Sequence, residues 1–215
     1  MRRAAEKSPE TARVVGASDP LPAQTPETFR TIVADPPWPF RWDGGKGGRR
    51  RRPTDLGYET MTIEQIAALP IGELADPEGC HLFLWVTPEL HREGEGVRVA
   101  RAWGFEPVDE LIWEKPNLGM GRFPRHCHEP LLIARRGTLS FHGPRDVRSV
   151  QRWRQPHAPG NGGKLHSAKP DGALDLIEQT SPGPYLELFA RRARLGWEYT
   201  GDESLGTVEL RGLAA

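Results

Sequence analysis

The chain has 215 residues, a length that suits one α/β domain and would crowd two. Hydrophobic residues make up 37% and charged residues 27%, and no apolar run approaches the roughly 20 residues that a membrane-spanning helix needs. The two cysteines, Cys80 and Cys127, are too few for a disulfide framework or a four-cysteine zinc site. These features exclude a disulfide-rich secreted protein and a bundle of membrane-spanning helices, and we expect a cytoplasmic location with no membrane partner.

Charge is unevenly distributed, although 29 basic and 29 acidic residues cancel over the whole chain. Basic residues dominate the segment from Arg41 to Arg52, where Asp43 is the only acid. They also dominate the segment from Arg135 to Lys169, where Asp146 is the only acid. Such clusters suit a polyanion, so the sequence favours nucleic acid as a partner.

The chain begins with a segment rich in Pro, Ala, Thr and Glu, which is typical of disorder. The β-branched run Thr31–Ala34 predicts a buried strand, and Asp35-Pro36-Pro37 ends it because proline cannot continue a central strand. The Gly- and Arg-rich stretch that follows, Asp43 to Pro53, predicts a surface loop. We expect a disordered tail, a single domain and a second short tail over residues 1–28, 29–206 and 207–215.

Helices and strands alternate in the rest of the chain. Thr62 and Gln65 have the spacing of a capping box, which predicts a helix over 63–69. Thr87 before a proline predicts the start of another helix, which ends near Trp103. The long, basic and turn-rich segment 137–169 predicts a functional loop, and a helix over 170–179 follows it. Further strands are predicted over 81–86, 109–114, 131–135, 185–190 and 197–200.

This alternation predicts one α/β domain with a mostly parallel sheet covered by helices on both faces. In open sheets of this type, ligands lie beyond the carboxyl ends of strands where the strand order reverses. Asp35 and Arg191 each follow a predicted strand. We therefore expect these two side chains to face each other across a binding cleft.

The residues Asp35-Pro36-Pro37-Trp38 carry groups suited to methylating the exocyclic amine of adenine. The lone pair of that amine is delocalised into the ring, so acceptors on its hydrogens favour attack and stabilise the charge that develops. The Asp35 carboxylate and the Pro36 carbonyl supply acceptors, and Trp38 supplies a ring that can stack on the base. The alternative is a strand that ends in a proline-rich turn with a tryptophan in the core, and four residues alone do not decide between the two.

The motifs around this tetrad resemble those of the family named for the 70-kilodalton, S-adenosylmethionine-binding subunit of eukaryotic messenger-RNA adenosine methyltransferase. The resemblance covers about residues 30–205, and the chain looks like the bacterial and phage members. The motifs follow in the same order, and they are Thr31–Trp38, Tyr58–Met61, Leu82–Thr87, Val108–Trp113 with Lys115, His126 with Glu129, Lys169–Asp171, Ser181–Gly183, Glu187–Arg191, Gly196-Trp197 and Gly201–Glu203.

The resemblance implies a Rossmann-like methyltransferase fold with a permuted motif order, in which the catalytic strand comes first and the cofactor strand last. It implies catalytic roles for Asp35, Pro36, Pro37 and Trp38. It also implies S-adenosylmethionine as cofactor, held by Asp35, Lys169, Phe189, Arg191, Asp202 and Glu203. Contacts with the substrate are implied for Tyr58 on a loop and for His126 and Glu129 at the rim of the active site.

Two basic stretches are candidates for contact with nucleic-acid phosphates. The first lies shortly after the catalytic tetrad and consists of Arg49, Arg50, Arg51 and Arg52. The second is Arg152-Trp153-Arg154, where an aromatic ring between two charges suits backbone contact and base stacking. A solvated loop is the alternative for both stretches.

Other features have plainer interpretations. The stretch Gly44–Gly47 lacks the spacing of a phosphate-binding loop. His126-Cys127-His128 matches no zinc pattern, so we expect no metal. We expect Trp85, Trp103 and Trp113 to pack in the core.

The sequence thus favours an enzyme that methylates N6 of adenine in DNA, with the base taken from a single strand or flipped from a duplex. DNA is preferred because the chain resembles bacterial and phage members that modify DNA. The alternatives are RNA as substrate, a catalytically silent nucleic-acid-binding subunit, and a methyltransferase that acts on the cytosine amine. A monomer and a dimer both fit the sequence.

Overall fold

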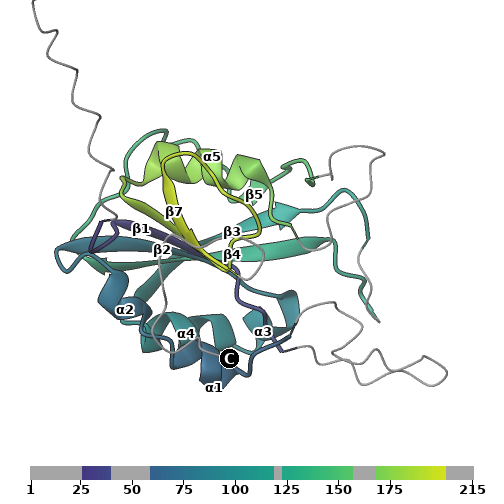
Figure 1. Cartoon of the computed structure of the whole chain (residues 1–215). Helices are drawn as coiled ribbons and strands as arrows, with labels where there is room; N and C mark the ends of the chain where they lie inside the picture. Colours follow the sequence, from purple (N-terminus) through teal and green to yellow (C-terminus); the bar gives the residue numbers. More distant parts are fainter. Residues whose placement is uncertain (1–25, 40–58, 119–122, 157–167, 202–215) are drawn as a thin grey trace, which may run out of the picture.

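A computed structural model describes residues 26–39, 59–118, 123–156 and 168–201. Within these ranges a twisted sheet lies between helices on its two faces (Figure 1). No helix in this part of the chain is long and apolar enough to cross a bilayer. Residues 1–25 of the tail expected over 1–28, the tail expected over 207–215 and the loop expected over 43–53 lie outside the described residues.

Seven strands form one sheet in the order β5-β3-β4-β2-β1-β6-β7. The strands are β1 (Thr31–Ala34), β2 (Gly79–Trp85), β3 (Glu106–Glu114), β4 (His128–Gly137), β5 (Val150–Gln151), β6 (Tyr185–Leu188) and β7 (Trp197–Thr200). The helices are α1 (Ile63–Ala67), α2 (Ile71–Leu74), α3 (Pro88–Arg92), α4 (Glu95–Ala102) and α5 (Asp171–Thr180). β4 runs antiparallel to both of its neighbours, and the other pairings are parallel. The predicted α/β domain with a mostly parallel sheet is confirmed.

The strand order reverses at β1. The chain places β2 on one side of β1 and returns at β6 to pair with the other side, and both pairings are parallel. Ala34, the last residue of β1, lies opposite Leu84 of β2 and Leu188 of β6. The N–H of Asp35 then donates to the Leu188 carbonyl at 3.4 Å. Asp35 therefore occupies the topological switch point, where sheets of this kind bind their ligands.

The two faces of the sheet carry separate hydrophobic cores. Neighbouring residues of a strand point to opposite faces, so Ile32 packs in one core and Val33 in the other. The first core includes Ile66 of α1 and Val99 of α4, and the second includes Ile177 of α5. Figure 1 shows the same division, with α5 on one side of the sheet and the other helices on the opposite side.

Local sequence signals placed one helix start correctly and missed one break. α1 begins after a capping box in which Thr62 and Gln65 bond reciprocally, as predicted. The single helix expected from Pro88 to about Trp103 is instead two helices, α3 and α4. Gly94 separates them with φ 80°, a left-handed conformation that glycine adopts without strain and that commonly ends a helix.

A buried polar network fixes β1 to its surroundings. Thr31, His81 and Ser181 are fully buried. The Ser181 hydroxyl lies 2.6 Å from His81 Nδ1 and 2.5 Å from the Thr31 hydroxyl. His81 Nε2 lies 3.2 Å from the Leu139 carbonyl, which fits a neutral imidazole that donates from Nε2 and accepts at Nδ1. Burial lowers the pKa of His81, which is consistent with the neutral ring.

We expect Ser181→Ala to destabilise the protein by about 1–3 kcal/mol, because it leaves the buried Nδ1 of His81 without a partner and leaves the Thr31 hydroxyl with the Pro182 carbonyl alone. Urea unfolding measures this loss, and Ser149→Ala, at an exposed serine outside the network, is the control. Equal stability of the two variants would show that the network does not fix β1.

Candidate active site

Four charged side chains of alternating sign meet at the edge of the sheet where β1 ends. Lys169 Nζ lies 2.7 Å from both carboxylate oxygens of Asp35 and 3.0 Å from a carboxylate oxygen of Glu129. Lys115 Nζ lies 2.5 Å from the other oxygen of Glu129. The side chains of Asp35, Glu129 and Lys169 are only 18%, 12% and 13% exposed. We call these four residues the charge cluster.

The topology brings the cluster together from distant parts of the chain. Asp35 follows β1, and Lys169 directly precedes Pro170, the N-cap of α5. Lys115 follows β3. Glu129 lies at the start of β4, and because β4 is antiparallel, its start shares an edge with the ends of β1 and β3. The antiparallel strand β4 therefore adds the Glu129 carboxylate to the site at which β1 and β3 end.

The cluster rests on a layer of tryptophan rings. Lys169 Nζ lies 5.6 Å from the centre of the Trp85 ring, and Lys115 Nζ lies 5.1 Å from that of Trp113. Trp85 makes edge-to-face contacts with Trp113 and Trp153. These rings exclude water from below and strengthen the interactions between the charges above them.

The tryptophans differ in how well their predicted roles agree with the structure. Trp85, Trp103 and Trp113 are buried, which confirms their expected place in the core. Trp153 was expected to offer a stacking face, but its ring packs against the core beside α5, and its carbonyl accepts from the Trp113 indole at 3.0 Å. The partly buried ring thus packs against the helix, where the glycine at position 172 leaves room for it, and its expected stacking role stays a prediction.

The diproline turn is held on both sides. The sequence predicts that the Pro36 carbonyl is a free acceptor. In the structure it accepts from the Trp38 N–H at 2.8 Å, and its second lone pair remains available. The Pro37 carbonyl accepts from the Met61 N–H at 2.9 Å. Trp38 is only 7% exposed, and its indole donates to the Trp85 carbonyl at 2.7 Å. The stacking role expected for Trp38 is thereby corrected, since this ring anchors the turn in the core.

Burial and charge oppose each other within the cluster. Burial raises the pKa of Asp35 above its ordinary value, and the Lys169 ammonium opposes this effect. Burial alone would lower the pKa of Lys169, but Asp35 and Glu129 together raise it. Burial alone would raise the pKa of Glu129, but Lys169 and Lys115 lower it. Two carboxylates therefore hold Lys169 in its charged form.

A further, partly buried carboxyl group lies beside the cluster. Burial and the negative charge of Asp35 raise the pKa of Glu187, on β6, to about 7. Glu187 lies opposite Val33 of β1, two residues before Asp35 along that strand. No separate role for Glu187 is predicted from the motifs, and the signal that could have found it is a charged residue within an otherwise apolar strand.

The end of β6 carries the residues expected to hold the cofactor. Phe189 takes φ 61°, a left-handed conformation that is uncommon for residues other than glycine and that tends to occur at ligand sites. Arg191 lies close enough to Asp35 for its charge to oppose the raised pKa of that carboxyl. The two strand ends thus meet at one site, as the sequence predicts.

The remaining predicted residues lie at the rim or outside the described ranges. His126 Nδ1 is 3.9 Å from a Glu89 carboxylate oxygen and does not join the charge cluster. Arg152 and Arg154 are exposed, and Arg152 pairs with Glu114 at 2.8 Å. Within the described ranges, no three His, Cys, Asp or Glu side chains are grouped to hold a metal ion. Tyr58, Arg49, Arg50, Arg51, Arg52, Asp202 and Glu203 lie outside the described residues.

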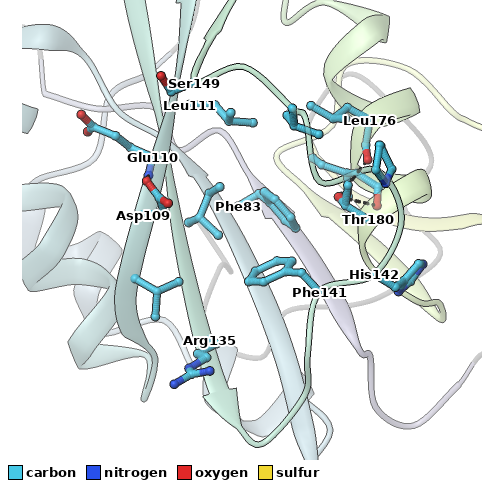
Figure 2. A pocket seen from close by; sticks show the side chains of 15 residues that line it. Phe83, Asp109, Glu110, Leu111, Arg135, Phe141, His142, Ser149, Leu176 and Thr180 are labelled. Atoms are coloured by element: carbon cyan, nitrogen blue, oxygen red, sulfur yellow. Dashed lines mark hydrogen bonds between the residues drawn. The ribbon is translucent and has the colours of Figure 1, made fainter.

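A separate cavity of about 490 Å³ lies between α5 and the sheet (Figure 2). Phe83, Phe141 and Leu176 line it, and Thr180, at the far end of α5 from Lys169, marks one side. It contains none of the residues of the charge cluster. The candidate site is therefore identified by its buried charges and its place at the switch point, not by this cavity.

Glu187 gives the protein a specific pH dependence. Its pKa of about 7 lies above the ordinary 4.5, so between these values the folded protein keeps a proton that the unfolded chain has lost. The free energy of unfolding therefore falls as pH rises through this window, by at most ~3 kcal/mol. In Glu187→Gln, whose side chain cannot ionise, this decrease in the free energy of unfolding should be absent.

Urea unfolding at about pH 5 and about pH 7 measures the effect. The free energy of unfolding of Glu187→Gln should rise relative to that of the wild type between about pH 5 and about pH 7. The control is Glu73→Gln, at an exposed position on α2. Parallel pH profiles for the wild type and Glu187→Gln would contradict a partly buried, protonated Glu187.

Comparison with known proteins agrees with this geometry. The model of the MT-A70 family matches residues 29–203. The human N(6)-adenosine-methyltransferase catalytic subunit METTL3 is 32% identical over 183 residues, which span 76% of this chain and 26% of METTL3. The N6-methyladenosine RNA methyltransferase MTA1 of Pyricularia oryzae is 32% identical over 224 residues, which span 92% and 53%. The human N(6)-adenine-specific methyltransferase METTL4 is 32% identical over 190 residues, which span 83% and 38%. The chain thus spans about a quarter to about half of the length of these relatives.

Proposed function

The chain belongs to the MT-A70 family, and from that premise we propose that it transfers a methyl group from S-adenosylmethionine to the exocyclic amine of adenine in nucleic acid. Members of this family are S-adenosylmethionine-dependent methyltransferases. The observation that carries the proposal is the buried contact of Lys169 with Asp35 and Glu129 at the switch point of the sheet.

The residues of the site fit such a methyl donor. S-adenosylmethionine supplies an electrophilic methyl group on a positively charged sulfur, next to an ammonium and a carboxylate group. Asp35 and Glu187 are partly buried carboxyl groups, and each has a raised pKa. A cationic ligand relieves that unfavourable burial of negative charge, and Lys169 offers an ammonium for a ligand carboxylate.

The same residues suit the chemistry of a poor amine nucleophile. Asp35 accepts a hydrogen bond from the amine, and the second lone pair of the Pro36 carbonyl offers another acceptor. Both acceptors stabilise the positive charge that develops on the nitrogen. Lys169 fixes Asp35 in place before the substrate binds, so the site needs little reorganisation.

We propose DNA as the substrate on the strength of the resemblance to members that modify DNA, and RNA is the second candidate. The names of METTL3 and MTA1, an adenosine methyltransferase and an RNA methyltransferase, favour RNA. Exposed Arg152 and Arg154 can contact the phosphates of either polymer. A silent binding subunit is disfavoured, because the tetrad Asp35–Trp38 is intact and Asp35 keeps its cationic partner.

Transfer of a labelled methyl group to DNA and RNA pools, followed by identification of the modified nucleoside, tests the proposal. We expect N6-methyladenine in DNA. Asp35→Ala should lower the rate by about 100-fold or more, as when a transition-state acceptor is lost. Asp109→Ala, at an exposed position on β3, is the control and should leave the rate unchanged.

The outcomes distinguish the parts of the proposal. Label confined to RNA would overturn the choice of DNA. Methylated cytosine would overturn the choice of base, and an unchanged rate in Asp35→Ala would overturn the assigned mechanism.

A further inference from the structure

Phe123 is almost fully exposed, with 96% of its surface accessible. It lies in the connection between β3 and β4, where Leu118 is also 59% exposed. Single exposed apolar residues are common on protein surfaces. The exposure of Phe123 is therefore informative only through its position and its surroundings.

The connection is attached at its base to the charge cluster. The backbone N–H of Lys115 donates to the Cys127 carbonyl at 2.7 Å, and the Lys115 side chain contacts Glu129 at 2.5 Å. Glu114 pairs with His128 across the ends of β3 and β4. The two ends of the connection therefore lie at the same edge of the sheet that carries Asp35, as the ends of β3 and β4 in Figure 1 show.

Two exposed arginines lie on the connection or at its base. Arg125 is exposed, and it donates to the Leu118 carbonyl at 3.5 Å. Arg152, which pairs with Glu114 at the base of the connection, is 81% exposed. An aromatic face beside guanidinium groups complements a nucleobase and its phosphate, whereas an apolar protein partner gains nothing from those charges.

We infer that Phe123 stacks on a base next to the target adenine and so holds the substrate strand at the mouth of the site. This role rests on the proposed function, because it assumes a nucleic-acid substrate. It also offers a ring far more exposed than that of Trp38, which is buried, or that of Trp153, which is partly buried. Phe123 is thus a positioning residue that acts on binding and not on the chemical step.

A cycle of enzyme and substrate variants tests the inference. The substrate is a single-stranded oligonucleotide with one adenine, compared with oligonucleotides in which either neighbouring base is replaced by an abasic site. We expect Phe123→Ala to raise KM and the dissociation constant by roughly 5- to 150-fold, the range for one stacked base, with little change in kcat. Phe123→Trp should restore binding. On the oligonucleotide that lacks the stacked base, Phe123→Ala should cause no further loss.

Leu195→Ala is the matched control, because Leu195 is 100% exposed just before β7 begins, at the opposite edge of the sheet. The inference is overturned if Phe123→Ala behaves like this control. It is also overturned if its penalty is the same on intact and abasic oligonucleotides, which would indicate a different partner for the ring. If the wild type transfers no methyl group, the proposed function fails, and the affinities of the oligonucleotides still decide the role of Phe123.

Discussion

The ammonium group of Lys169 lies between the carboxylates of Asp35 and Glu129, and the rest of the site depends on this contact. A charge removed from water is tolerated only when partners replace its hydration. If the lysine is removed, Asp35 loses its ion-pair partner, Glu129 keeps only Lys115, and the two carboxylates repel each other. The sheet topology, the antiparallel β4 and the tryptophan layer all serve to bring these groups together and keep water away from them.

Several unfavourable features are concentrated within this small region. Glu187 is a partly buried carboxyl group with a raised pKa, and Phe189 has a left-handed backbone. Neither feature helps the fold, and both flank the strand end that carries Asp35. Proteins retain such costs where a ligand or a reaction makes use of them. The arrangement is that of a site prepared before its ligands arrive, in which the cationic methyl donor that we propose would meet carboxylates already held in place.

The sequence predicts well whatever depends on neighbouring residues. The β-branched run Thr31–Ala34 and the aromatic run Trp197–Thr200 coincide with β1 and β7, and the capping box at Thr62 marks the start of α1. The motif order also indicated that Asp35 and Arg191 belong to one site, which the pairing of β1 with β6 explains. These signals need no knowledge of distant contacts.

The features that were missed depend on distant contacts. A glycine such as Gly94 is tolerated inside a helix, so the sequence does not specify a break there. The structure shows the break, because Gly94 has a left-handed backbone conformation between α3 and α4. Glu129 was predicted at the rim of the site, but its contacts with Lys115 and Lys169 were not, because they depend on the antiparallel pairing of β4, which a run of apolar residues does not specify. The most direct measurement is the free energy of unfolding of Lys169→Met, of Asp35→Asn with Glu129→Gln, and of all three changes combined. We expect Lys169→Met to cost about 3–5 kcal/mol and the triple variant to recover most of it, because the buried carboxylates are then neutral. Additive effects, or a Lys169→Met variant as stable as the wild type, would contradict the central role of the lysine.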